Sequence, residues 1–161
     1  MSAGRIVIAT DGSASAEAAI DVGLELAAGR ASDVVFVHFS PAAVALFAAE
    51  PETGPSQETI EEADPVLRAA ADAARAMGVR AELEIFAEHG AADIANALVG
   101  LARGLDAGLI VVGTRGHGMI GSAALGSVSR SLVSFSDLPV LVVHAGHDRV
   151  RAADESRSSP A

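Results

Sequence analysis

The sequence predicts an α/β fold, in which a parallel five-stranded sheet carries helices on both faces. Short apolar segments rich in Val and Ile alternate along the chain with longer segments whose apolar residues recur at helical spacing. This alternation implies right-handed crossovers between parallel strands. Half of the 161 residues are apolar and only five are aromatic, all of them Phe. Such a composition suits a core of Ala, Val, Leu and Ile between helices and a sheet.

Residues 5–9 and the turn that follows them predict the first strand and helix. The run RIVIA is short and apolar, and it leads to Asp11 and Gly12, which favour a turn. Ser13 can accept a hydrogen bond from a backbone N–H and so cap a helix. We expect this helix to end at Gly29, because glycine commonly terminates helices.

A second strand is predicted at residues 33–39, and an irregular segment follows it. Residues 41–56 are rich in Ala, Pro, Gly and Glu, and helix is expected only around 42–49. The next helix is expected to take Asp64 as its cap and Pro65 in its first turn, in preference to a kink at the proline. Its apolar face is expected to comprise Ile60, Ala63, Leu67, Ala70, Ala74 and Met77.

The rest of the chain continues the same alternation. After Gly78 ends the preceding helix, residues 79–86 (VRAELEIF) alternate as a half-exposed strand does, which places this strand at a sheet edge. Residues 91–103 carry apolar residues at helical spacing. The remaining elements are expected to be a strand at 109–112, a helix at 127–136 and a strand at 139–144.

Residues 1–145 are expected to form one domain, since a chain of this length is most economically a single domain. The tail 146–161 is polar, and we expect it to be disordered. No apolar run is long enough to span a bilayer, and the first residues do not resemble a signal peptide. Together with the absence of cysteine, these observations make the cytoplasm the expected location and a membrane partner unexpected.

The composition excludes several kinds of chemistry. All eleven basic residues are Arg, so a Walker A loop and Schiff-base catalysis are excluded. The absence of cysteine excludes thiol catalysis and zinc ribbons. The formal charge of −10 and the lack of Tyr and Trp make nucleic-acid binding unexpected. An acidic cluster without metal-ligand spacing is interpreted as solvated surface, and it comprises Glu50, Glu52, Glu58, Glu61, Glu62 and Asp64.

A glycine-rich loop between the last two predicted strands is the strongest functional signal. Its glycines are Gly113, Gly116, Gly118, Gly121 and Gly126. Glycine lets backbone N–H groups turn toward an anion, and the start of the following helix adds N–H groups and a positive dipole end. Ser127 and Ser129 could add hydroxyl donors there, or simply cap the helix. The loop is therefore predicted to bind phosphate, and it would face residues 10–12 if the first and fourth strands are neighbours.

The spacing G-x-x-G at 113–116, followed after nine residues by Gly126 and Ser127, resembles the nucleotide motif of the universal stress protein family. The similarity covers about residues 4–144, with the blocks IVIATDGS, VVFVHF, GLDAGLIVVGTRGHG and SVSRSLVSFSDLPVLVVH. It implies a Rossmann-like, HUP-type sheet of strand order 3-2-1-4-5 and a homodimer formed through the last strand, 139–144. It also implies the ATP-binding branch of the family, with an adenine nucleotide as ligand. Because the loop offers neutral N–H and hydroxyl donors and no lysine, Mg²⁺ is the expected counterion of the phosphates.

The resemblance further implies which residues surround each part of the nucleotide. Ala9, Thr10 and Asp11 would lie around the adenine and the ribose, although Asp11 would also suit a simple turn. Phe39 would line the base pocket, where the family often has a small aliphatic residue. The residues expected near the ribose and phosphates are Gly113, Arg115, Gly116, Gly126, Ser127, Val128 and Ser129. Independently of the resemblance, His117 is the one histidine whose position in the loop suggests a phosphate contact.

Rival interpretations are weaker on the same residues. Residues 116–121 also read G-x-G-x-x-G, but that dinucleotide fingerprint belongs after the first strand of a βαβ unit, with an acid ending the next strand. Here the next strand ends in His144, which disfavours NAD or FAD. Hydrolase motifs of the types G-x-S-x-G and H-E-x-x-H do not occur. His38, on an apolar strand, is interpreted as a hydrogen-bonded structural residue.

Three functions stay open at this point. The first is a regulatory homodimer that binds ATP, hydrolyses it slowly at most, and acts on an unknown partner protein. The second is an enzyme that transfers adenylyl or phosphoryl groups with the same loop, using Arg115 or His117 near the phosphates. The third is a structural dimer whose site no longer binds a nucleotide. We expect the first, because no lysine or evident base is placed to activate water.

Overall fold

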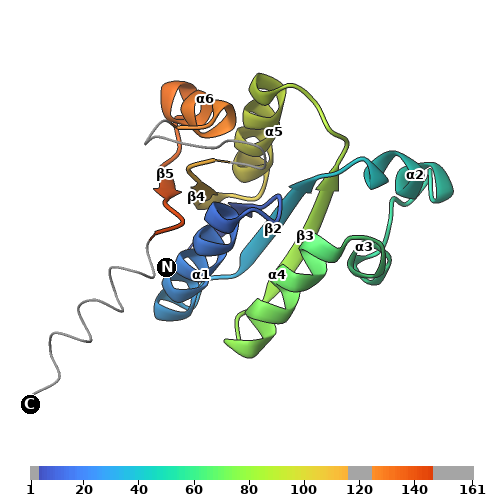
Figure 1. Ribbon diagram of the computed structural model, residues 1–161. Helices are drawn as coiled ribbons and strands as arrows, with labels where there is room; N and C mark the ends of the chain where they lie inside the picture. Colours follow the sequence, from blue (N-terminus) through green and yellow to red (C-terminus); the bar gives the residue numbers. More distant parts are fainter. Residues whose placement is uncertain (1–3, 116–124, 147–161) are drawn as a thin grey trace, which may run out of the picture.

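The computed structural model describes residues 4–115 and 125–146, and its five strands form one parallel sheet flanked by helices (Figure 1). The strand order is β3-β2-β1-β4-β5, which confirms the predicted order 3-2-1-4-5. The strands are β1 (Arg5–Ala9), β2 (Val34–Phe39), β3 (Ala81–Phe86), β4 (Ala107–Gly113) and β5 (Val140–Val143). The helices are α1 (Ala14–Arg30), α2 (Ala42–Ala49), α3 (Gln57–Ala63), α4 (Pro65–Ala76), α5 (Ala91–Gly104) and α6 (Ser127–Phe135).

The sheet separates two apolar cores. On one face, Ile8, Leu24 and Phe36 belong to a core between the strands and the helices α1, α3 and α4. On the other face, Leu98 and Ile110 belong to a core that α5 and α6 complete. All four strand pairings are parallel, so the carboxyl ends of the strands lie at one edge of the sheet. Ligands of such folds bind at that edge.

The first helix begins where the sequence predicts and ends slightly later. Ser13 caps α1, since its Oγ accepts a hydrogen bond of 3.3 Å from the Ala16 N–H. The helix continues through Gly29 to Arg30, so the expected stop at Gly29 is wrong. The left-handed residue is instead Ala31, with φ of 51°. Its N–H donates to the last carbonyls of the helix, and these hydrogen bonds determine where the chain turns.

The predicted second helix is two helices that meet at Asp64. Asp64 has extended backbone angles and caps α4, because its Oδ1 accepts a hydrogen bond of 2.9 Å from the Leu67 N–H. Pro65 is the first residue of α4, as predicted, and the residue before a proline avoids the helical region. Ile60 and Ala63 therefore belong to the separate helix α3 and not to the face of α4. Ile60 is nevertheless buried in the same core.

The strand β3 lies at the sheet edge, as its alternating sequence predicts. Leu83 and Ile85 are buried, whereas Glu82 and Glu84 point to the other face of the strand and are partly exposed. Burial, with a smaller contribution from the neighbouring Glu82, raises the pKa of the Glu84 carboxyl. Within the described parts of the chain, the helices are all too short or too polar to cross a lipid bilayer.

Candidate functional site

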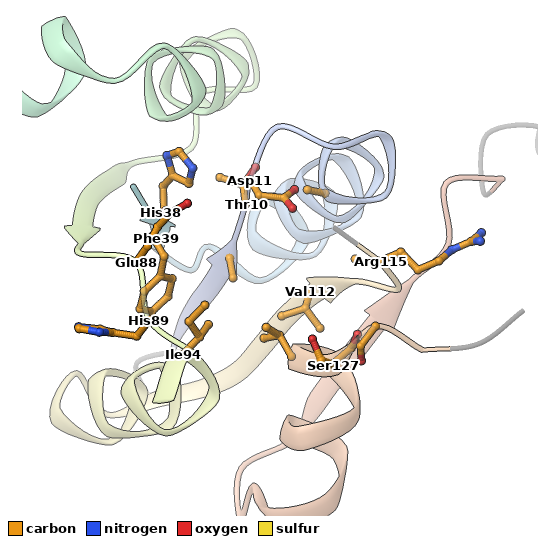
Figure 2. Close-up of a pocket in the computed structure, with 16 residues that line it drawn as sticks. Thr10, Asp11, His38, Phe39, Glu88, His89, Ile94, Val112, Arg115 and Ser127 are labelled. Carbon is orange, nitrogen blue, oxygen red and sulfur yellow. Dashed lines mark hydrogen bonds between the residues drawn. The ribbon is translucent and has the colours of Figure 1, made fainter. Parts of the chain in front are cut away.

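A cavity of about 410 Å³ opens at the carboxyl ends of the strands (Figure 2). Its lining comes from the ends of β1, β2 and β4, the loop after β3, and the first turns of α1, α5 and α6. Ten of the twelve residues predicted from the sequence line it, namely Ala9, Thr10, Asp11, Phe39, Gly113, Arg115, Gly126, Ser127, Val128 and Ser129. The other two, Gly116 and His117, lie outside the described residues.

The turn after β1 holds Asp11 at the mouth of this cavity. Gly12 adopts a φ of +76°, which favours glycine, and its N–H donates to Thr10 Oγ1 at 3.3 Å. The Ser13 N–H donates to Asp11 Oδ1 at 3.0 Å. The turn is thus closed by its own side chains, which gives the Asp11 carboxylate a defined position beside the cavity.

The end of β4 is joined to α1 by close packing and hydrogen bonds. A Cβ at Gly113 would lie 2.5 Å from Ser15 Oγ and 2.6 Å from the Ser15 carbonyl carbon. The hydroxyls of Ser13 and Ser15 both donate to the Arg115 carbonyl, the first at 3.3 Å. The glycine at 113 is therefore required by the packing of α1 against β4, whatever the backbone there binds.

The first turn of α6 presents backbone donors to the cavity. Its N-cap is Gly126, which has no side chain to cap the helix, and Ser127 is the first helical residue and not a cap. The Gly126 N–H donates to the Thr114 carbonyl at 2.6 Å, and the buried Ser129 hydroxyl donates to the same oxygen at 3.0 Å. The Ser129 hydroxyl therefore holds the loop in place. The N–H groups of the first turn are not capped by a side chain, so they can bind an anion.

The other end of the cavity has an apolar wall. Phe39 lines it together with Ile94 and Val112. The ring of Phe39 stacks on Phe86, with centroids 5.4 Å apart and planes inclined by 23°. Figure 2 shows Phe39 and Ile94 on one side of the cavity, with Arg115 and Ser127 on the opposite side. The cavity thus combines an apolar wall with a cluster of hydrogen-bond donors.

Several lining residues were not predicted from the sequence. Glu88 and His89 follow β3, and both are exposed at the rim of the cavity. The signal for them was available, because the carboxyl ends of parallel strands share one edge and the loop after β3 must lie there. His38 also borders the cavity, but its Nδ1 lies 2.8 Å from Oδ2 of the buried Asp64. This hydrogen bond confirms the structural role predicted for His38.

A model of the universal stress protein family matches residues 3–144 of this chain. The chain belongs to the universal stress protein family. The match covers all five strands and the whole of the cavity lining that the structure describes. The resemblance read from the glycine spacing is therefore confirmed at the level of the family.

Relatives of this universal stress protein include proteins with bound nucleotides. A universal stress protein of Mycolicibacterium smegmatis (strain ATCC 700084 / mc(2)155) is 30% identical over 154 residues, which are 94% of this chain and 51% of the relative. The chain thus spans about half the length of that protein. A universal stress protein solved in complex with cAMP is 29% identical, with a TM-score of 0.63 over 90% of this chain and 99% of its own. One from Archaeoglobus fulgidus, in complex with dAMP, is 26% identical, with a TM-score of 0.62 over 89% and 99%.

Proposed function

We propose that this universal stress protein binds ATP in the cavity and acts as a regulatory homodimer. The observation that carries the proposal is the polarity of the cavity, with uncapped backbone donors of α6 at one end and the apolar wall of Phe39 and Ile94 at the other. A nucleotide has a similar division, since its phosphates are anionic and the faces of its flat base can stack on apolar side chains. The relatives solved with cAMP and dAMP support an adenine nucleotide as the ligand class.

The residues present suit each part of such a ligand. The N–H groups of residues 127–129 and the Arg115 side chain would hold phosphate oxygens, and Gly116 and His117 stay predicted contacts of the same kind. The Asp11 carboxylate would accept hydrogen bonds from the ribose. Among the described residues, His, Asp and Glu side chains nowhere gather in a group of three that could hold a metal ion. Mg²⁺ would therefore be held mainly by the phosphates.

The same geometry favours binding over catalysis. Figure 2 shows His38, Glu88 and His89 at the end of the cavity that holds Phe39, away from Arg115 and Ser127. A general base must lie within hydrogen-bond reach of the attacking water, and the chain has no lysine to stabilise a phosphoryl transition state. We therefore expect ATP hydrolysis to be slow at most. A rapid steady-state turnover of ATP would favour the alternative of an adenylyl- or phosphoryl-transfer enzyme.

The proposal is tested by calorimetric titration of ATP with Mg²⁺ into the wild type and the variant Gly126→Val. A Cβ at Gly126 would lie 3.2 Å from the Thr114 carbonyl oxygen and 3.4 Å from Arg115 Cα, so the larger side chain would displace the donors of α6. We expect the affinity for ATP to fall by at least about tenfold, the loss of roughly one or two hydrogen bonds to a charged group.

Gly100→Val is the matched control, because a Cβ at Gly100 meets no atom within 4 Å. This variant should bind ATP as the wild type does. If Gly126→Val also binds ATP unchanged, the phosphates do not lie at α6. If the wild type carries no nucleotide in native mass spectrometry and binds none in solution, the third possibility holds, a structural dimer without a working site.

A further inference from the structure

The segment 41–63, which we call the arm, leaves the sheet after β2 and returns to it at α4. Figure 1 shows its two helices, α2 and α3, together beside the sheet next to β3. Both of its ends are fixed. Just before the arm, the Ser40 N–H donates to the Phe86 carbonyl at 2.8 Å. Just after it, Asp64 Oδ2 lies 2.8 Å from His38 Nδ1. We propose that the outer surface of the arm is a docking surface for a cationic amphipathic helix of a partner protein.

The helix α2 is apolar on its exposed side as well as on its buried side. Its sequence is AAVALFAA, and Ala43 is its only buried residue, while Leu46 packs partly against the core. Val44 is 65% exposed and Phe47 is 46% exposed. A surface helix ordinarily carries polar residues on its outer face, and contiguous exposed apolar residues typically mark an interaction site. The exposed side of α2 therefore offers apolar contacts to a partner.

The rest of the arm adds negative charge beside these apolar residues. The arm contains five acidic residues and no basic residue. Glu61 is paired with Arg75 at 2.6 Å, but no ion pair within the described residues involves Glu52, Glu58 or Glu62. The helices α2 and α3 contact each other, so these carboxylates and the apolar side of α2 belong to one compact segment. Arg68 of α4 donates hydrogen bonds to the carbonyls of Glu61 and Glu62 and offsets part of this charge. The arm itself keeps a net negative charge beside its apolar residues.

The arm is also rigidly attached, so that its surface is preformed. Gln57 Nε2 donates a hydrogen bond of 2.9 Å to the Leu83 carbonyl, and Gln57 Oε1 accepts one of 2.7 Å from the Leu83 N–H. These two hydrogen bonds fix the start of α3 to the edge strand β3. A preformed surface loses little conformational entropy on binding, which favours the association.

The charge of the arm decides which occupant is favoured. A second copy of this chain would bring the same acidic arm and a formal charge of −10, and an anionic membrane or a nucleic acid would also be repelled. A helix with one apolar face and Arg or Lys on its flanks would bury Val44 and Phe47 and pair with the carboxylates. This docking surface does not include the nucleotide cavity, so the test of the docking proposal does not depend on whether the protein binds ATP.

The probe for the test is a synthetic 18-residue helical peptide with Leu on one face and Arg on the other, labelled for fluorescence anisotropy. A control peptide carries Glu in place of Arg. We expect the Arg peptide to bind the full chain and the double variant Val44→Ser/Phe47→Ser to weaken this binding at least tenfold. The triple variant Glu52→Gln/Glu58→Gln/Glu62→Gln should weaken it as well and should reduce its dependence on salt.

Met77→Ser is the matched control variant, since Met77 is 43% exposed at the end of α4, outside the arm. It should bind the Arg peptide as the wild type does. The proposal is overturned if the Arg peptide does not bind, if Met77→Ser weakens binding as much as the double variant, or if the Glu peptide binds equally well. The proposal would also be overturned if the protein binds phosphatidylglycerol vesicles and the double variant does not, because the arm would then be a membrane-binding surface.

Discussion

At the scale of single residues, two glycines of one motif are explained by different neighbours. Around Gly113 the nearest atoms are the backbone and hydroxyl of Ser15, at 2.5–2.7 Å from the position of a Cβ. Around Gly126 the nearest atoms are the Thr114 carbonyl and Arg115 Cα, at 3.2 and 3.4 Å. The first glycine lets a helix approach a strand, and the second lets the loop close over the start of α6. A substitution should therefore affect folding at one position and ligand binding at the other.

Gly113→Ala should destabilise the protein by about 1–3 kcal/mol, because backbone atoms of Ser15 cannot move aside as a flexible side chain can. Urea unfolding followed by circular dichroism gives this difference. Gly100→Ala, with open space around its Cβ on an exposed side of α5, should leave the stability unchanged or raise it by up to about 1 kcal/mol. Equal stability of Gly113→Ala and the wild type would show that α1 does not pack on β4 as described.

At the scale of elements, the helices α3 and α4 start with caps of unequal importance. Ser56 caps α3 in an exposed position, where its Oγ accepts a hydrogen bond of 3.1 Å from the Thr59 N–H. Asp64 caps α4 while only 2% exposed, and it also holds the His38 ring. The loss of a buried cap leaves two groups without partners, the Leu67 N–H and His38 Nδ1. The loss of the exposed cap leaves one N–H that water can satisfy.

Asp64→Ala is therefore expected to lower the free energy of unfolding by about 2–4 kcal/mol, the sum of a lost cap and an unsatisfied buried partner. Ser56→Ala should lower it by about 0.5–1 kcal/mol, as exposed caps do. Both values come from chemical denaturation at neutral pH. If the two substitutions cost the same, the hydrogen bond between His38 and Asp64 contributes nothing to stability.

These elements also show how far the sequence could predict the structure. The strands and the caps Ser13 and Asp64 follow from local sequence patterns, and the structure confirms them. The end of α1 was not, since it depends on how Ala31 turns the chain, not on where a glycine stands. The rim residues Glu88 and His89 were missed because no local motif marks them, and their place follows only from the parallel sheet as a whole. The ligand contacts of the site residues stay predictions.

At the scale of the whole molecule, the two edges of the sheet differ. At the β3 edge, Gln57 occupies the N–H and carbonyl of Leu83, so this edge is blocked to another strand. At the β5 edge, the carbonyls of Pro139 and Val143 accept hydrogen bonds from β4, and no described strand pairs with the other side. Because the backbone of a strand alternates in direction, Val140 and Val142 direct their polar groups outward. The open edge supports the proposed homodimer through β5.

Val142→Pro tests this assembly. Proline removes the outward N–H of residue 142 but leaves the hydrogen bonds that join β5 to β4 through residues 139 and 143, so the dimer should be lost while the protomer stays folded. Sedimentation velocity should show the wild type as a dimer and the variant as a monomer, with equal circular dichroism spectra. Val133→Ser, on the exposed side of α6, is a control for the loss of an apolar surface residue alone. A variant that still sediments as a dimer would show that the interface does not depend on the outward edge of β5.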